Sequence, residues 1–378
     1  MVLIVGMETD ITIIGCGLAG LVELRKILVQ KKYVSLVADG FGAAQHMNGV
    51  FDFPEALAFC EFYGVPVATQ AEQWVAFDQA GRVRPVGQVG RVGQAPAVFV
   101  TQGLLLAEAQ QIKKVLFVEI LDLVDFPSAL VVPGLKKTFP AMTKVCFSGL
   151  KLNLTAPHAH LLQLFDNGSC VELFKQFLLK NKGDAELIVI PPVLGIKNFV
   201  EIHQKLEKDL GVRIVEQLST TPPVAGLRFT HIIKKFFADK KINVIWGKVD
   251  GFHAENGEVK SLNVQCALRR CSGQATGNAQ CASIKAKEFI LATGKFVGGG
   301  ISFHDGVREE IFDFPCSAGD DAVSKNVPVT RLIQRDPLQE QAIFKLGVVV
   351  DDKGCPIDSI SKKPIYKNVR AVGDVREN

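Results

Sequence analysis

The sequence has little excess charge of either sign, no close cysteine pair and no long apolar run, and each absence excludes a class of protein. Its 43 basic and 39 acidic residues leave a net charge of +4 over 378 residues, with no dense basic block. This balance argues against nucleic-acid binding and still permits a small anionic substrate. No window reaches the roughly 18 uninterrupted apolar residues that a membrane-spanning helix needs. We therefore expect no direct membrane span.

The nine cysteines are scattered and form no CxxC motif. Cys266, Cys271 and Cys281 have a spacing unlike the usual zinc or iron–sulfur motifs, so buried thiols in a reducing cytosol explain them better than a metal site. His158 and His160 form an HxH pair that no nearby ligand pattern completes, and we expect a surface loop there. The apolar start MVLIVGM is too short for a signal sequence. The expected location is cytoplasmic.

The first forty residues contain the turn of a dinucleotide-binding fold. Residues 10–14 predict a buried strand, 21–31 a helix and 34–38 a second strand. The turn before the helix has the pattern GxGxxG. Its first glycine permits the tight turn, the second lets the backbone approach a pyrophosphate, and the third allows close helix packing. The predicted cofactor-binding residues of this turn are Gly15, Gly17, Leu18, Ala19 and Gly20.

Asp39 follows the second strand, 24 residues after Gly15. A carboxylate at this place accepts the hydroxyls of a ribose. A GxGxxG pattern alone is weak, and the alternative is a glycine-rich turn with Asp39 capping a loop. The order of strand, turn, helix and strand favours the nucleotide.

Two further turns follow apolar strands late in the sequence. Thr293 and Gly294 come after the strand at 288–291, and Gly373 and Asp374 close the sequence Val369–Asp374. Both turns belong at the carboxyl edge of the sheet, where open α/β folds bind ligands. With the first turn they resemble the three signatures of flavoproteins of the glutathione-reductase and fumarate-reductase type. That resemblance implies that Asp374 holds the ribityl chain of a flavin, whereas a surface turn is the alternative.

These patterns predict an α/β protein with a Rossmann-like FAD/NAD(P)-binding fold, a central parallel sheet and an inserted mixed α+β substrate or cap domain. Inside the insertion we expect strands at 115–120 and 187–193 and helices at 170–180 and 199–210. After it we expect a helix at 231–240, a strand at 242–246 and a turn at 255–257. The expected domain parts are 1–60, 226–300 and 341–378 for the flavin-binding domain, 61–225 for the insertion and 301–340 for a cap excursion.

The segments between the turns show a closer resemblance. Similarity in the same order to the B subunit of anaerobic glycerol-3-phosphate dehydrogenase runs through Ala44–Asp52, Pro191–Gly195, Pro222–Arg228 and Ala292–Gly300. The resemblance implies a flavin subunit, usually with FMN, alongside an FAD-bearing catalytic subunit and an iron–sulfur subunit that anchors the complex to the inner face of the membrane. It implies oxidation of sn-glycerol 3-phosphate to dihydroxyacetone phosphate, with electrons passed to quinone. Asp39 would instead favour the adenosine of FAD, so FMN and FAD both stay open.

Two departures from that family leave alternatives open. The glycine-rich stretch and helix that follow the Gly-Asp turn in the family do not follow Asp374, and the glycine-rich stretch 86–94 replaces a pattern containing Pro and Thr. We expect a shortened version, a site completed by a partner, or impaired flavin binding. The alternative functions are a non-catalytic flavin-carrying or assembly subunit, and a flavin oxidoreductase for another small hydroxy acid or polyol.

Alcohol oxidation by a flavin needs a general base and, for a phosphorylated substrate, a cationic anchor. His46 follows the second strand and is the candidate base. Arg228 is the candidate phosphate anchor, with a structural ion pair as an equal alternative. His304 is better explained as a solvated loop residue.

Overall fold

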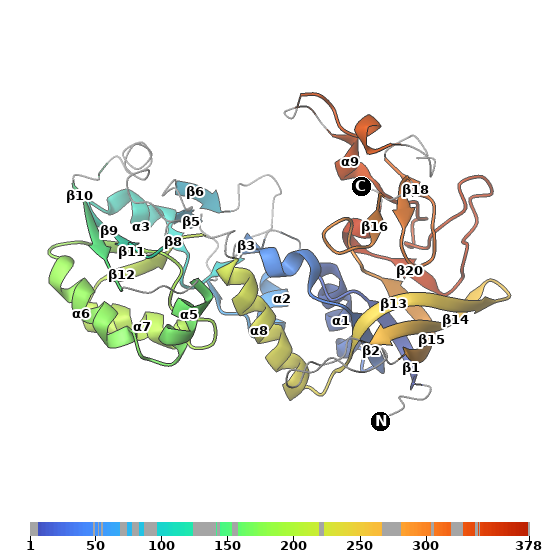
Figure 1. Cartoon of the computed structure of the whole chain (residues 1–378), viewed down its shortest axis with the longest axis horizontal. Coiled ribbons are helices and arrows are strands. Elements are labelled where there is room, and N and C mark those ends of the chain that lie inside the picture. The colour runs from blue at the N-terminus through green and yellow to red at the C-terminus, as the bar shows by residue number, and fades with distance from the viewer. Residues whose placement is uncertain are drawn as a thin grey trace. The chain divides into compact units, whose positions relative to one another are not determined.

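The computed structural model describes residues 7–47, 50–51, 53, 56–68, 74–77, 83–86, 97–123, 141, 144–152, 158–218, 223–266, 281–303, 306–318, 328–336, 339 and 341–376. The chain divides into two compact units, one formed by 1–44 and 237–378 and the other by 45–236 (Figure 1). The sequence analysis placed the insertion at 61–225, so the unit boundaries lie 16 residues earlier and 11 residues later than that range.

The first unit is built on a mixed sheet whose parallel half comes from both ends of the sequence. Its strands are β1 (Met7–Ile14), β2 (Val34–Ala38), β13 (Asn243–Glu255), β14 (Glu258–Cys266), β15 (Cys281–Leu291) and β20 (Val369–Ala371). The parallel strands follow the order β13-β2-β1-β15-β20. The expected α/β architecture with a parallel sheet is therefore confirmed.

The sequence explains why β1 and β2 lie in the middle of that sheet. All five residues of β2 are buried, as in a strand covered on both faces. The crossover between them is helix α1 (Leu18–Val29), which starts three residues before the predicted start at Leu21. The last residues of the GxGxxG pattern, from Leu18 onward, already form the first turn of the helix.

Strand β14 joins β13 and β15 in an antiparallel meander. The hairpin turn falls on Asn256 and Gly257, which both have positive φ, at 54° and 74°. Two positive φ values match a type I′ turn, whose twist suits an antiparallel hairpin. The predicted turn at 255–257 is present.

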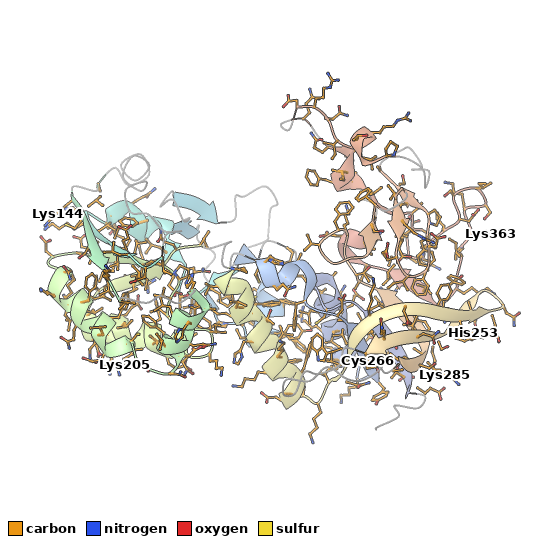
Figure 2. All side chains as sticks on the ribbon, viewed as in Figure 1. Lys144, Lys205, His253, Cys266, Lys285 and Lys363 are labelled. Carbon is orange, nitrogen blue, oxygen red and sulfur yellow. The ribbon has the colours of Figure 1, made fainter. Side chains whose placement is uncertain are left out.

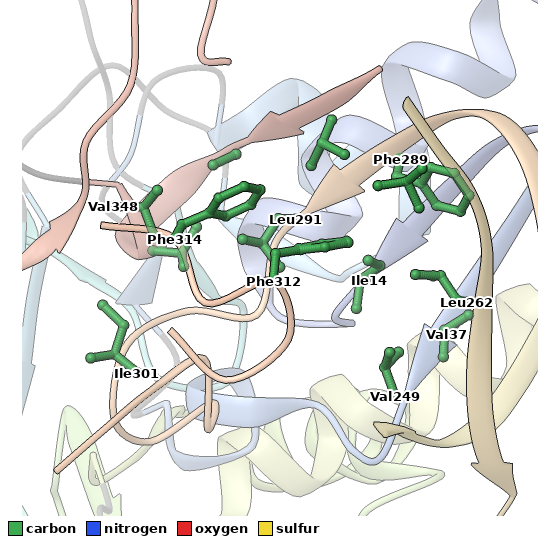
Figure 3. Close-up of a cluster of buried hydrophobic side chains, with 14 of the residues drawn as sticks. Ile14, Val37, Val249, Leu262, Phe289, Leu291, Ile301, Phe312, Phe314 and Val348 are labelled. Carbon is green, nitrogen blue, oxygen red and sulfur yellow. The ribbon is translucent and has the colours of Figure 1, made fainter. Parts of the chain in front are cut away.

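The core of the first unit lies between the meander, the parallel strands and the segments after β15 (Figure 3). Those segments form β16 (Ile301–Ser302), β17 (Arg308–Glu309), β18 (Cys316–Ser317), β19 (Gly347–Val348) and the short helix α9 (Ala342–Lys345). They bring Phe312, Phe314 and Val348 against Leu262 and Leu291 in one buried cluster. Burial of these side chains, at about 25 cal/mol per Å² of apolar area, stabilises the late segments on the sheet.

The second unit contains a separate parallel sheet of four strands in the order β10-β9-β11-β12. The strands are β9 (Lys114–Ile120), β10 (Lys144–Leu150), β11 (Leu187–Ile190) and β12 (Arg213–Glu216). Helices α6 (Val171–Asn181) and α7 (Phe199–Leu210) lie along one side of the sheet and α3 (Leu106–Gln111) along the other (Figure 1). Ala109 and Ile112 pack with Val115 and Val189 in a second buried cluster.

The described part of this unit also contains helices α2 (Ala56–Tyr63) and α5 (His158–Asp166), most of α8 (Val224–Asp239) and two small antiparallel sheets. The sheets consist of β3 (Val50–Phe51), β4 (Val67–Ala68) and β7 (Ala97–Phe99), and of β5 (Trp74–Phe77), β6 (Val83–Val86) and β8 (Leu104–Leu105).

Further predictions also differ from the structure. Strand β11 ends at Ile190, before the predicted Val193, because Pro191 and Pro192 have no N–H for a ladder. Helix α8 begins at Val224, seven residues before the predicted His231, directly after Pro223. His158 begins α5 and is buried, with Nε2 3.0 Å from the carbonyl oxygen of Pro192, so the surface-loop prediction was wrong.

The described residues hold no candidate for a membrane span or a metal centre. No helix among them is long and apolar enough to cross a membrane. In the same part of the chain, no three His, Cys, Asp or Glu side chains gather in a way that could hold a metal ion. Cys266 ends β14 (Figure 2), whereas Cys271 and most of the glycine-rich stretch 86–94 lie outside the described residues.

Candidate functional site

The first glycine turn lies where three parallel strands end. The Gly15 N–H donates to the carbonyl oxygen of Val37 at 2.8 Å, and the Ala292 N–H donates to that of Ile14 at 2.8 Å. Gly15 has a φ of +111°, and a Cβ there would overlap the backbone carbonyl of Ala292. Only glycine satisfies both the conformation and the close approach. The turns after β1 and β15 are thus packed backbone to backbone.

Helix α1 presents an uncapped N-terminus above this turn. Its N-cap is Gly17, no side chain caps it in the described structure, and its first turn holds no acidic residue. A Cβ on Gly20 would overlap the carbonyl oxygen of Gly15, whereas one on Gly17 would find its nearest atom, the Phe41 carbonyl oxygen, at 3.9 Å. Gly20 therefore lets α1 pack closely against the turn at Gly15, whereas the space beside Gly17 is open. The first N–H groups of α1, from Leu18 onward, face that space as donors for an anion.

The second turn, after β15, forms a cradle of closely packed glycine backbone. Gly294 has a φ of +72°, and a Cβ on Gly298 or Gly300 would overlap the carbonyl oxygen of Thr293 or of Gly294. The Oγ1 atom of Thr293 is buried and has no hydrogen-bond partner among the described residues. A buried hydroxyl without a hydrogen-bond partner is unfavourable by about 1–3 kcal/mol, so this atom is a candidate donor to a bound group.

The third turn completes the same edge of the sheet. The Val372 N–H donates to the carbonyl oxygen of Leu291 at 2.9 Å, which aligns the end of β20 with the end of β15. Gly373 has a φ of +68°, and a Cβ there would overlap the Cβ of Ala19 in α1. Asp374 follows, with an exposed side chain. The three predicted turns therefore converge at one carboxyl edge.

Asp39 directly follows β2 and is exposed. Because β2 and β1 are parallel neighbours, this carboxylate lies on the same sheet edge as the glycine turns. In dinucleotide-binding folds the carboxylate that binds the ribose hydroxyls lies at the end of the strand next to the glycine turn, and Asp39 has this position.

A partly buried charge network fixes α1 to the sheet. The Arg370 guanidinium in β20 donates to Glu23 Oε2 of α1 at 3.1 Å and to Glu288 Oε1 at 3.0 Å. Burial acts to raise the pKa of Glu23, but the hydrogen bond from Lys26 and the charge of Arg370 outweigh it and hold that pKa below its ordinary value. The helix is thus tied to the strand that carries the third turn.

Sequence reasoning missed Lys295, the residue that directly follows Gly294. Its ammonium is partly buried and donates to the carbonyl oxygen of Phe344 at 2.6 Å. Burial lowers the pKa of Lys295, and the charge of Asp374 opposes that effect. The available signal was a cation placed immediately after a predicted cofactor turn.

The candidate base and anchor belong to the second unit. His46 ends the short helix η1 (Gly42–His46), and its side chain is exposed. His304 lies outside the described residues. Arg228, on α8, is completely buried.

The surroundings of Arg228 match the ion-pair alternative. Its two terminal nitrogens donate to Glu216 Oε2 at 2.5 Å and to Oε1 at 2.9 Å. Its Nε donates to the carbonyl oxygen of Gly195 at 2.8 Å, and its guanidinium carbon lies 4.3 Å from the ring centre of Phe199. The Arg228 guanidinium thus links α8 to β12 through Glu216 and to α7 through Phe199. Its N–H groups donate to acceptors of the protein itself.

Comparison with known proteins gives two curated relatives. No family model matches the chain. The B subunit of anaerobic glycerol-3-phosphate dehydrogenase from Histophilus somni strain 2336 is 26% identical over 217 residues, which are 57% of this chain and 46% of the relative. The protein of the same name from strain 129Pt is 28% identical over 155 residues, 41% of this chain and 33% of the relative. The matches span less than half of either relative.

Solved structures with some likeness were also found. The match to 3-ketosteroid-Δ4-(5α)-dehydrogenase from Rhodococcus jostii RHA1 covers 98% of this chain and 91% of that enzyme's chain, at 11% identity and a TM-score of 0.33. The match to L-amino acid deaminase from Proteus myxofaciens covers 76% of this chain and 46% of the deaminase chain, at 9% identity and a TM-score of 0.28. TM-scores this low give no basis for an inference about this chain. The predicted resemblance to the B subunit of anaerobic glycerol-3-phosphate dehydrogenase is, in contrast, confirmed by the two curated relatives.

Proposed function

We propose that the chain is a flavin-dependent oxidoreductase subunit whose cofactor lies at the carboxyl edge of the first unit's parallel sheet. The observation that carries the proposal is the convergence of three glycine turns beside an uncapped helix. The buried hydroxyl of Thr293, which has no hydrogen-bond partner among the described residues, lies in the second of these turns. The strand order β13-β2-β1-β15-β20 is that of dinucleotide-binding sheets and supports the proposal.

The residues at this edge fit such a cofactor. The N–H groups at Gly17, Leu18 and Ala19 would hold its phosphate, because they stand at a helix N-terminus with open space before them. Asp374 would accept hydrogen bonds from the ribityl hydroxyls. Thr293 and Gly294 complete the cradle with Gly373.

FMN and FAD make different demands on this edge. An FAD molecule would extend its adenosine ribose toward Asp39, whereas FMN would leave that exposed carboxylate without a ligand. The predicted family points to FMN and the position of Asp39 to FAD.

The proposed reaction is oxidation of sn-glycerol 3-phosphate to dihydroxyacetone phosphate, and similarity to the two named relatives supports it. When bound, the flavin supplies a two-electron acceptor for the hydride of the alcohol carbon. The chain supplies orientation and a base for the hydroxyl proton, a role that we propose for His46. The electrons would reach quinone through partner subunits, an FAD-bearing catalytic subunit and an iron–sulfur subunit at the inner face of the membrane.

The contacts of Arg228 bear on the substrate anchor. Both terminal nitrogens already donate to Glu216, and the side chain has no exposed surface. Moving this guanidinium to a phosphate would leave Glu216 buried without a countercharge, which is strongly unfavourable. We therefore propose a structural role for Arg228 and do not assign it to the phosphate of the substrate.

The first experiment is the visible absorbance spectrum of the purified chain, followed by release and chromatography of any yellow cofactor. We expect bound flavin, or binding of added FMN or FAD with a defined stoichiometry. A folded chain that binds neither would refute the proposal.

A second experiment separates the functions that share a flavin. Anaerobic addition of glycerol 3-phosphate should bleach the bound flavin of the isolated chain. Bleaching that requires the partner subunits would identify a flavin-carrying subunit, and bleaching by a different hydroxy acid or polyol alone would reassign the substrate.

A further inference from the structure

Two turns of the first unit carry the two most exposed large apolar side chains of the described chain. One turn, which we call the α9 turn (331–336 and 341–344), exposes 49% of Ile333 and 71% of Phe344. The other, the 358–363 turn, exposes 93% of Ile360. A single exposed apolar residue needs no explanation, but each of these turns also carries two cations.

A buried glutamine holds the α9 turn in one conformation. The carboxamide of Gln341 makes three hydrogen bonds with the backbone of its own loop, to the Gln334 N–H at 2.5 Å and to the carbonyl oxygens of Asp336 and Gln339 at 2.9 and 3.0 Å. The Ile343 N–H also donates to the carbonyl oxygen of Leu332 at 3.0 Å. This bond brings the next residues along the chain, Ile333 and Phe344, to neighbouring positions. Their exposure therefore belongs to a fixed turn.

A carboxylate holds the 358–363 turn in a similar way. Asp358 Oδ1 accepts the N–H groups of Ile360 and Ser361 at 3.2 and 2.7 Å. The Asp358 carbonyl oxygen accepts the Lys362 N–H at 3.0 Å, and the Asp358 N–H donates to the carbonyl oxygen of Lys363 at 2.9 Å. The turn therefore presents the apolar Ile360 together with two lysines, and all three side chains are exposed.

The charges of the two turns are predominantly positive. The turns hold four exposed cations, Arg331, Arg335, Lys362 and Lys363. Their described acids are Asp336 and Asp358, and the carboxylate of Asp358 accepts hydrogen bonds from its own turn. In the described part of the chain, none of the four cations forms an ion pair. Exposed cations beside exposed apolar groups match a surface that is anionic outside and apolar beneath.

The arrangement of the turns favours a bilayer over a protein partner. In the view of Figures 1 and 2, α9 and Lys363 stand on the same side of β13 and β14, so a flat surface can approach both turns. A protein partner would need a continuous surface complementary to both turns and to the area between them. A bilayer accepts apolar side chains at any spacing along its face.

We propose that the first unit binds the surface of an anionic lipid bilayer through the α9 turn and the 358–363 turn. Ile333, Phe344 and Ile360 enter the boundary between headgroups and acyl chains, and the four cations bind lipid phosphates. The contact is made by this chain itself and needs neither a partner subunit nor a bound flavin. Because the cations are exposed, salt screens their share of the binding.

The test is co-sedimentation of the purified chain with vesicles of phosphatidylcholine alone and of phosphatidylcholine mixed with phosphatidylglycerol. We expect binding to the mixed vesicles that weakens as salt is added, and little binding to phosphatidylcholine alone. Arg331→Gln with Arg335→Gln should lower the association constant for the mixed vesicles roughly fivefold for each charge removed, and so should Lys362→Gln with Lys363→Gln.

Matched controls separate the turns from the rest of the surface. Lys32→Gln with Lys240→Gln removes two exposed lysines outside the turns and should have little effect. Phe344→Ser should weaken binding on the order of tenfold, because it removes the largest apolar contact. Val29→Ser, at the end of α1, changes a residue that is 68% exposed and should not weaken binding.

Phe344→Trp measures insertion directly. Its fluorescence should be quenched by vesicles with brominated acyl chains more strongly than that of the unmodified chain, whose own tryptophans are Trp74 and Trp246. Quenching that is no stronger in the variant shows that this side chain does not enter the bilayer and overturns the proposal.

Three further outcomes would overturn it. They are the absence of vesicle binding, equal binding to both kinds of vesicle, and binding that the turn variants leave unchanged. A chain that binds soluble polyglutamate through the same turns but binds no vesicle would reassign them to an acidic protein. Urea unfolding followed by circular dichroism checks the fold of each variant, and if the arginine pair fails to fold, the lysine pair provides the same comparison. A chain that binds no flavin refutes the proposed function and leaves this test intact.

Discussion

Replacing Arg228 by methionine should destabilise the second unit strongly. Arg228 and Glu216 are both completely buried, and the guanidinium contacts both carboxylate oxygens. Arg228→Met keeps an unbranched side chain but leaves the carboxylate of Glu216 without its countercharge. Removing one partner of a buried ion pair lowers the free energy of unfolding by about 3–5 kcal/mol. For a unit of this size, the corresponding fall in Tm is on the order of 10 °C.

The pH dependence of that loss follows from Glu216. In the intact chain burial acts to raise the pKa of Glu216, but the charge of Arg228 and its hydrogen bonds outweigh burial and hold that pKa below the ordinary value. The pair therefore stabilises the fold above the pKa of the unfolded carboxyl, and this contribution disappears as the pH falls through the lower folded value. In Arg228→Met the charge and the hydrogen bonds of Arg228 are gone, and we expect burial to outweigh the remaining hydrogen bonds from Leu194 and Thr101. The folded carboxyl should then bind a proton more tightly than the unfolded one. The loss should accordingly be larger at pH 8 than at pH 5.

A double variant and an exposed pair serve as controls. In Glu216→Gln with Arg228→Met, the glutamine oxygen still accepts the Leu194 N–H, as Glu216 Oε1 does at 3.0 Å. We expect this neutral pair to recover most of the lost stability. Lys287→Met removes an exposed ion pair with Asp10 and should change stability little.

Urea unfolding followed by circular dichroism at both pH values measures these changes. An Arg228→Met variant as stable as the exposed control, or one whose loss is the same at pH 5 and pH 8, would refute the reasoning. A variant with unchanged stability and a raised KM for glycerol 3-phosphate would restore the phosphate-anchor role.

The remaining predictions concern the first unit. Burial raises the pKa of Glu309 to about 7 from the ordinary 4.5, so the intact chain should lose roughly 3 kcal/mol of stability as the pH rises from 4.5 through 7, and Glu309→Gln should flatten this slope in urea titrations. Gly15→Ala forces a side chain into a φ of +111° and the Ala292 carbonyl, and it should lower the unfolding free energy by more than about 1 kcal/mol; unchanged stability would contradict the close packing. Gly17→Ala should keep the fold and weaken flavin binding on the order of tenfold, as judged by fluorescence titration. Asp39→Ala should weaken binding of FAD and leave that of FMN unchanged, and equal effects on both would contradict the ribose assignment.

Local patterns in the sequence predicted the elements that carry their own signals. Helix α7 begins and ends at the predicted residues Phe199 and Leu210, because its apolar residues repeat at helical spacing and Gly211, with a φ of +63°, terminates it. Strand β2 also matches its prediction at 34–38, as a short apolar run of the sort that a parallel sheet buries.

Features that depend on distant partners were not predictable in this way. The sequence left Arg228 with two alternatives, because its partner Glu216 lies on a different element, and the intervening residues carry no mark of the pairing. Lys295 was overlooked for a similar reason, since its contact with Phe344 joins segments 49 residues apart. Pattern reasoning located the glycine turns, and the charges around them required the three-dimensional arrangement.

The position of β15 has a consequence for how the chain folds as it is synthesised. Ile14 pairs with Leu291, so one edge of β1 has no partner strand until about 280 residues later in synthesis. At roughly 5–20 residues per second, that delay lasts tens of seconds on the ribosome. The second unit, encoded between the two strands, has its own parallel sheet and emerges complete during this interval. We therefore expect the middle of the chain to become protease-resistant first, while the N-terminal strand waits with an open edge that chaperones must shield.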